Sequence, residues 1–263
     1  MRFLIACFLL IVTAVTAAGA DNDARPVDRF TLREAADFSK QVERELASRG
    51  AYIALVFRSG RPRSDLPDGM RYTHGAFWIY GPVTEADGSQ GHGYAVYNLY
   101  HGAADPTTSY LAQDWPLDFM RGDAIGEVGV IIPSAEMQIR LLDVVASEQY
   151  DRLHQPNYSL LSNPADLRFQ NCTEFLLDVV AAAAWLTDDR ERIKVNLDAY
   201  FPPTQLRLGW WERLTAGWFD PRIRLDDQRS GPVNIASFSS ISDFMLTFDL
   251  ADESFEIERD PAD

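Results

Sequence analysis

The sequence predicts a mixed α+β fold in which an antiparallel sheet of four or more strands packs on helices. Three observations lead to this class. Short runs rich in β-branched and aromatic residues alternate with stretches that have helical periodicity. Two of the strand-like runs are joined by a polar connection, as in a hairpin, and no internal repeat or interdomain linker is evident. We therefore expect a single α+β domain over residues 31–250.

Residues 1–20 are typical of a secretory signal peptide. Arg2 supplies a positive charge, residues 3–15 are almost entirely apolar, and residues 18–20 are small enough for a cleavage site. The apolar segment has about a dozen residues, whereas a spanning helix needs roughly 20, which favours export over a membrane anchor. We therefore expect a mature chain that begins near Asp21, is periplasmic or secreted, and has no transmembrane segment.

The first half of the domain contains most of the expected strands. Residues 21–30 are polar, and an amphipathic helix is expected from Thr31 to Gly50 because its apolar residues recur every three or four positions. Pro133 and Ser134 begin a second helix, which extends through Val145. The strand-like runs are residues 52–57, 72–80, 93–100 and 127–132.

The second half is predominantly helical. A loop-rich stretch after Tyr150 leads to a helix from Cys172 to about Trp185. The acidic tail, residues 251–263, is expected to be frayed. Between these segments we expect helices over residues 188–200, around residues 210–214 and over residues 239–248, with a strand over residues 233–238.

The charge balance excludes some partners. The 263-residue chain has 24 Lys and Arg against 39 Asp and Glu, a formal charge of -15, and loss of Arg2 with the first 20 residues would make it -16. Such a surface is repelled by nucleic acid and by anionic lipid. An acidic surface also serves solubility alone, so it names no partner. The substrate class stays open among small molecules, peptides and lipids.

Cys172 is the only cysteine left once residues 1–20 are set aside, because Cys7 lies in the apolar segment. A lone thiol in an oxidising compartment is either an inert core side chain or a reactive group. Asn171 is a favourable helix N-cap, and the backbone N–H groups of a helix start favour a thiolate. The apolar stripe that Cys172 shares with Phe175 and Val179 is equally what a core cysteine would show. Both interpretations are open, and a neighbouring imidazole would favour the reactive one.

Four histidines are candidates for that imidazole. His74 lies in Tyr-Thr-His-Gly-Ala-Phe-Trp, where small residues interrupt a bulky strand and allow its side chain to reach a helix end. His92 follows a glycine in a turn, His101 caps the third strand, and His154 lies in the loop before the cysteine. None has a second ligand at metal-site spacing, and no phosphate-binding glycine motif is present. We expect neither a metal nor a cofactor.

The order of the motifs resembles that of known families. A strand that opens on Tyr-Thr-His-Gly and a downstream Asn-Cys-Thr-Glu-Phe at a helix start resemble the circularly permuted papain-like enzymes. These are relatives of the NlpC-type cell-wall peptidases in which His precedes Cys, as in the lecithin:retinol acyltransferase group. More narrowly, most of the chain resembles an uncharacterised bacterial family, domain of unknown function 2145. Its features include Pro-Asn-Tyr-Ser, here residues 156–159, and Pro-Thr-x-Leu-Arg-Leu, here residues 203–208.

This resemblance implies a permuted papain-like or NlpC-like fold with the cysteine at the N-terminus of a core helix. Cys172 matches the nucleophile and His74 the general base. A third residue, normally on the next strand, orients the imidazole. Asn98 is the first choice because an amide can accept the ring N–H, and His101 is the second. Many relatives have His or a carboxylate there, so an Asn departs from their pattern.

Two functions follow as hypotheses. The first is an exported thiol hydrolase, such as an amidase, peptidase or esterase, or an acyl transferase that uses the Cys172/His74 pair. The second is a non-catalytic binding or scaffolding domain with Cys172 packed in its core. In that second case tryptophans could line a ligand groove, although tryptophan is more often an ordinary core or rim residue. The candidates are Trp78, Trp115, Trp210, Trp211 and Trp218.

Overall fold

The computed structural model describes residues 30–84, 88–208 and 220–260. The signal peptide expected at residues 1–20, most of the polar segment before residue 31 and the helix expected around residues 210–214 lie outside the described residues. The expected mixed α+β class with an antiparallel sheet packed on helices is confirmed.

A six-stranded antiparallel sheet forms the centre of the molecule, with strand order β4-β3-β2-β1-β5-β8. β2 and β1 lie in the middle, and β4 and β8 form the edges. A separate ribbon pairs two short strands, β6 and β7. The strand bounds are β1 Ile53–Arg58, β2 His74–Thr84, β3 Gln90–His101, β4 Ser109–Asp114, β5 Glu127–Pro133, β6 Thr204–Leu206, β7 Val233–Ile235 and β8 Ala251–Glu258.

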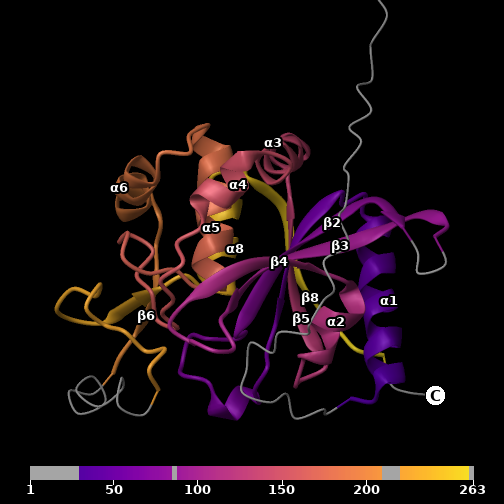
Figure 1. Ribbon diagram of the computed structural model, residues 1–263, viewed down its shortest axis with the longest axis horizontal. Coiled ribbons are helices and arrows are strands. Elements are labelled where there is room, and N and C mark those ends of the chain that lie inside the picture. Colours follow the sequence, from indigo (N-terminus) through magenta and orange to yellow (C-terminus); the bar gives the residue numbers. More distant parts are fainter. Residues whose placement is uncertain (1–29, 85–87, 209–219, 261–263) are drawn as a thin grey trace, which may run out of the picture.

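Helices cover both faces of this sheet, so the described chain has three layers (Figure 1). One face carries α1 and α2, which pack against each other. The other face carries α3, α4, α5 and α8, and α6 packs on α5. The helix bounds are α1 Leu32–Ser48, α2 Pro116–Arg121, α3 Ala135–Val145, α4 Glu148–Leu153, α5 Cys172–Trp185, α6 Arg190–Tyr200 and α8 Phe238–Thr247.

Local signals explain where the first helix begins and ends. Thr31 and Glu34 form a reciprocal capping box that satisfies backbone N–H groups at the start of α1. Gly50 follows the helix with a φ of 67°, in the left-handed region that glycine adopts without steric cost. The predicted helix from residue 31 to residue 50 is therefore confirmed to within two residues of its C-terminus.

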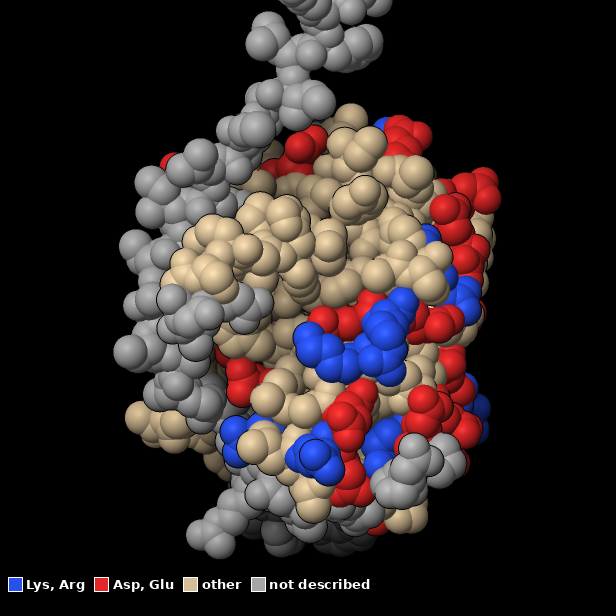
Figure 2. All heavy atoms as spheres, turned by 90° about the vertical axis from the view of Figure 1, so that its right-hand side faces the viewer, with Lys and Arg blue, Asp and Glu red and all other residues tan. Residues whose placement is uncertain are grey.

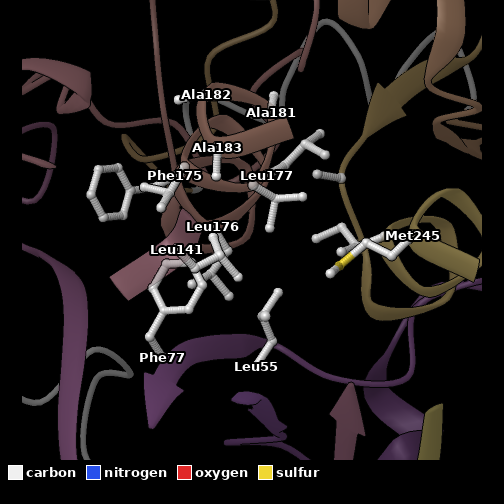
Figure 3. Packing of buried hydrophobic residues seen from close by; sticks show 14 of the residues in the cluster. Leu55, Phe77, Leu141, Phe175, Leu176, Leu177, Ala181, Ala182, Ala183 and Met245 are labelled. Atoms are coloured by element: carbon white, nitrogen blue, oxygen red, sulfur yellow. The ribbon is translucent and has the colours of Figure 1, made fainter. Parts of the chain in front are cut away.

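The alternation of side chains along β2 separates two cores. Phe77 pairs with Leu55 of β1, and both face α5, where they meet Leu176 and Leu177 (Figure 3). Trp78 lies on the opposite face, in the cluster formed with α1 and α2. Successive strand residues point to opposite faces, so Gly75 faces α5 and His74 faces α2.

Residues 251–258 correct the expectation of a frayed tail, because they form the edge strand β8. Phe255 and Ile257 pair with Val130 and Val128 of β5 and bury their side chains in the core shared with α1. The acidic composition concealed this two-residue alternation. Two of the acidic side chains are neutralised by arginines, Glu253 by Arg49 and Glu256 by Arg71.

Acidic and basic side chains are interspersed on the face that carries α1 (Figure 2). Lys40 pairs with Glu43 and Arg49 with Glu45 along this helix. Exposed pairs of this kind contribute little to stability, about 0 to 1 kcal/mol each. On this face the excess of acidic residues therefore produces no broad patch of one sign.

Candidate active site

Cys172 is the first residue of α5, and hydrogen bonds fix the backbone on either side of it. The Asn171 side chain caps the helix, since its Oδ1 accepts the backbone N–H of Glu174 at 2.9 Å. Its Nδ2 donates to the backbone oxygen of Leu160 at 2.9 Å, and the Thr173 hydroxyl donates to that of Ala236 at 2.9 Å. The start of α5 is therefore held by two neighbouring segments of the chain.

A glycine lets this helix start lie directly against β2. A Cβ atom on Gly75 would be 2.7 Å from Leu176 Cδ1 and 2.7 Å from the Phe57 ring, closer than such atoms approach in proteins. Only glycine allows α5 to pack at this separation. One turn earlier on the helix, the Cys172 Sγ lies 3.9 Å from the backbone oxygen of Thr73, the residue before His74.

His74 is held by Asn98 on the neighbouring strand. Its Nε2 is 2.9 Å from Asn98 Oδ1. The Asn98 amide nitrogen donates to Asp114 Oδ2 at 3.1 Å, which turns the amide oxygen towards the ring. An amide oxygen only accepts, so Nε2 carries the proton and Nδ1 keeps its lone pair. The Tyr100 hydroxyl also donates to Asp114 and fixes the carboxylate that orients Asn98.

The surroundings of His74 keep its imidazole neutral. The residue is only 2% exposed, and its ring stacks on Tyr100 at a centroid distance of 5.3 Å, with Phe119 5.6 Å away. Burial, with the positive charge of Arg58 adding to it, lowers the pKa of His74 to about 3, against the hydrogen bond that the ring donates to Asn98. At neutral pH this imidazole is a proton acceptor.

His101, the alternative third residue, has different partners. It lies on the α5 face of the sheet, 5.7 Å between ring centroids from Tyr158. Its Nε2 accepts a hydrogen bond from Arg222 Nη1 at 3.3 Å, and Arg222 is held in turn by Asp220. The structure thus brings Asn98 to His74 and brings His101 to Arg222.

His92 and His154 are the remaining histidines, and two of the five candidate tryptophans fall within the described residues. His92 is exposed on β3, and His154 Nε2 lies 2.9 Å from the Ser109 hydroxyl. Trp78 is fully buried in the core, the more common place for a tryptophan, and Trp115 precedes α2 at the surface. Trp210, Trp211 and Trp218 lie outside the described residues.

Cys172 and His74 line the same pocket, whose volume is about 470 Å³. Most of its wall is apolar, and Arg61 and Arg222 with Asp65 and Asp220 supply charged groups. The apolar lining residues are Leu66, Pro67, Met70, Leu160, Leu161, Leu208, Ile223, Ile235 and Ala236. This volume suits a small organic group of the size that enclosed ligand sites accommodate.

A buried ion cluster beneath the same helix was not predicted. Lys194 of α6 is 3% exposed, and its Nζ lies 2.6 Å from Glu174 Oε1 and 2.6 Å from Asp178 Oδ1. Burial raises the pKa of Glu174 to about 8 against the lowering by the Lys194 ammonium, and the Asp178 carboxylate adds to the rise. The sequence signal was present: two acidic residues four apart on an otherwise apolar helix imply a buried cation.

Neither a cluster of metal ligands nor a membrane-spanning helix is found within the described residues. Among them, no group of three or more His, Cys, Asp or Glu side chains is arranged to hold a metal ion. None of the helices within the described ranges combines the length and the apolar character needed to cross a bilayer.

Comparison with protein families identifies the relatives of this site. A model of the bacterial family described as "Uncharacterized protein conserved in bacteria (DUF2145)" matches residues 45–245. The chain belongs to this family. The match includes Cys172, His74 and Asn98. The comparison with curated proteins gave no match, and the comparison with solved structures gave none either. In this DUF2145 protein, the segments at residues 156–159 and 203–208 both reach the cysteine pocket, since Tyr158 and Leu208 line it.

Proposed function

We propose that this DUF2145 protein is an exported thiol enzyme, a hydrolase or acyl transferase with the permuted papain-like arrangement in which His74 precedes Cys172. One observation carries the proposal. Cys172, a thiol at a capped helix start, lines a pocket together with His74, the first residue of β2, whose neutral imidazole is held by an amide. The ring lies towards α2, so the proton would pass at the end of the strand, where Cys172 Sγ lies 3.9 Å from the backbone oxygen of Thr73.

The proposed reaction divides the work among these groups. The Cys172 sulfur attacks a substrate carbonyl carbon while His74 Nδ1 takes the thiol proton. The C–N, C–O or C–S bond to the leaving group then breaks, and His74 returns the proton to that group. Water in a hydrolase, or an acceptor alcohol or amine in a transferase, attacks the acyl-enzyme by the reverse sequence. Backbone N–H groups in the first turn of α5 would hold the oxyanion, and Asn98 would steady the imidazolium.

The residues of the pocket wall narrow the range of possible substrates. An amide, ester or thioester fits the chemistry, and the apolar residues beside Cys172 favour a substrate with an apolar group next to the reacting carbonyl. Binding of that group removes its apolar surface from water, which favours binding by about 25 cal/mol for each Å² buried.

Export is part of the proposal. The pattern of residues 1–20 supports a cleaved signal peptide and a periplasmic or secreted enzyme. In that compartment a chain with one remaining cysteine cannot lose its nucleophile to an intramolecular disulfide.

An acyl-enzyme trap tests the function. We expect the purified chain to react with p-nitrophenyl butyrate or octanoate, to release nitrophenolate and to gain one acyl group by intact mass, at Cys172. Cys172→Ala should abolish acylation, and His74→Ala should slow it by about 10²-fold or more, as loss of a general base does. His92→Ala, which removes an exposed imidazole, should leave the rate unchanged.

The outcome also separates the two buried imidazoles. His101→Ala should change the rate less than His74→Ala. Acylation at a residue other than Cys172, or no acylation of a folded chain by either ester, would reject the thiol mechanism. A larger loss in His101→Ala than in His74→Ala would reject His74 as the base.

A further inference from the structure

A second cavity lies between the ends of three helices and shares no lining residue with the cysteine pocket. Its volume is about 450 Å³. Trp185 from the end of α5, Tyr200 from the end of α6, and Phe244 and Phe248 from the end of α8 line it, with Asn196 as the polar group. The proposed thiol chemistry makes no use of this cavity.

The four rings form a closed circuit around the cavity. Their centroids are 6.4 Å apart for Trp185 and Tyr200, and 6.4 Å for Tyr200 and Phe248. The circuit closes with 5.2 Å between Phe248 and Phe244, and 6.3 Å between Phe244 and Trp185. The planes are inclined by 48° to 85° rather than stacked, so ring faces as well as edges are presented to the space between them.

Two of these rings are open to solvent. Tyr200 is 57% exposed and Phe248 is 47% exposed, whereas Phe244 is buried. Apolar rings left this accessible around a cavity are unusual in a core and common at a binding site. Tyr200 and Phe248 therefore form the solvent-exposed side of the cavity.

The backbone makes the same cavity electronegative. α5 ends at Trp185, α6 at Tyr200 and α8 at Thr247, and none of the three has a basic residue in its last turn. Helix C-termini carry partial negative charge, which attracts cations. Arg140 of α3 donates to the backbone oxygen of Ala184 at 3.4 Å, but Glu136 neutralises it. The chain as a whole carries a formal charge of -15.

We propose that this cavity binds a quaternary ammonium group. Ring faces attract such a cation electrostatically when it lies within about 6 Å of the ring centroids, and three helix C-termini add to the attraction. A primary ammonium is strongly hydrated, and no carboxylate that would replace its hydration is among the described residues that line the cavity. A methylated ammonium has no N–H to satisfy and is weakly hydrated. The site recognises the trimethylammonium group that free choline and choline headgroups of lipids share.

Titration calorimetry with choline tests this proposal, and 3,3-dimethyl-1-butanol is the control ligand because it has the same shape without the charge. We expect choline to bind at least about tenfold more tightly than the neutral alcohol. Tyr200→Leu and Phe248→Leu keep apolar bulk at exposed positions and should each weaken choline binding about fivefold or more. Tyr110→Leu, which removes an exposed ring on β4, should have no effect.

Vesicles of phosphatidylcholine distinguish the two sources of the ligand. Binding to vesicles that choline displaces assigns the site to a lipid headgroup, and binding of choline without binding of vesicles assigns it to a free solute. Equal affinity for choline and for the neutral alcohol would overturn the proposal. So would failure of the folded chain to bind choline, or binding that survives in both Leu variants.

Discussion

Removal of the buried Lys194 charge is expected to destabilise the protein strongly. In Lys194→Met, the Asp178 carboxylate loses contacts of 2.6 and 2.8 Å and keeps only the Gln170 amide at 2.7 Å. Breaking a buried ion pair by removing one partner costs about 3–5 kcal/mol. With a urea slope of about 2–3 kcal/mol per molar, the unfolding midpoint should fall by roughly 1.5 M.

Equilibrium unfolding in urea, followed by circular dichroism, measures this shift. Arg152→Met is the matched control, because Arg152 pairs with Asp188 at the surface and its loss should cost no more than about 1 kcal/mol. A variant that also carries Glu174→Gln and Asp178→Leu should recover much of the stability, since no unpaired charge stays buried. A midpoint change in Lys194→Met as small as that of Arg152→Met would refute this reasoning.

Three further predictions concern the same region. Gly75→Ala should reduce the free energy of unfolding by about 1–3 kcal/mol and slow Cys172 acylation, because the added methyl group displaces α5. Unchanged stability and an unchanged acylation rate would contradict the close packing of α5 on Gly75. Asn98→Ala should slow acylation about 10-fold or more and leave KM nearly unchanged, because the amide orients the His74 ring without touching substrate. A change in KM alone would contradict this role of Asn98. Glu174 has a folded pKa of about 8, above its ordinary value, so the native state binds more protons than the unfolded state between about pH 4.5 and 8. The stability of the parent relative to Glu174→Gln should therefore fall as pH rises through that window, and a flat difference in urea titrations from pH 5 to 9 would contradict it.

Periodicity predicted much of the fold because side-chain burial follows it directly. The helix from Cys172 to Trp185 and the strand at residues 127–132 were recognisable because apolar runs of those lengths have few alternatives. β4 was missed because Ser109–Asp114 is short and half-exposed, and β8 was missed because its acidic residues mask the alternation of Phe255 and Ile257. Edge strands are the least apolar strands of a sheet, so their pattern is the weakest.

The sequence predicted which residues belong to the candidate site, but not the hydrogen bonds that connect them. Cys172, His74 and Asn98 were chosen from motif order and strand position, and the structure joins the last two by a hydrogen bond. The contribution of Asp114, which turns the Asn98 amide, depends on the register of β3 with β4 and leaves no mark in the sequence. The pairing of His101 with Arg222 joins residues 121 positions apart, which only the folded chain brings together.

The pH dependence of Cys172 alkylation measures activation of the thiol by His74 without knowledge of the substrate. Because the imidazole is neutral and takes the thiol proton as the sulfur attacks, iodoacetamide should label Cys172 well below pH 8.5, the ordinary value for a thiol pKa being about 8.5. In His74→Ala the midpoint of the rate profile should move up towards that value, and His92→Ala should match the parent. Labelling only at high pH, with the same midpoint in the parent and in His74→Ala, would contradict the account.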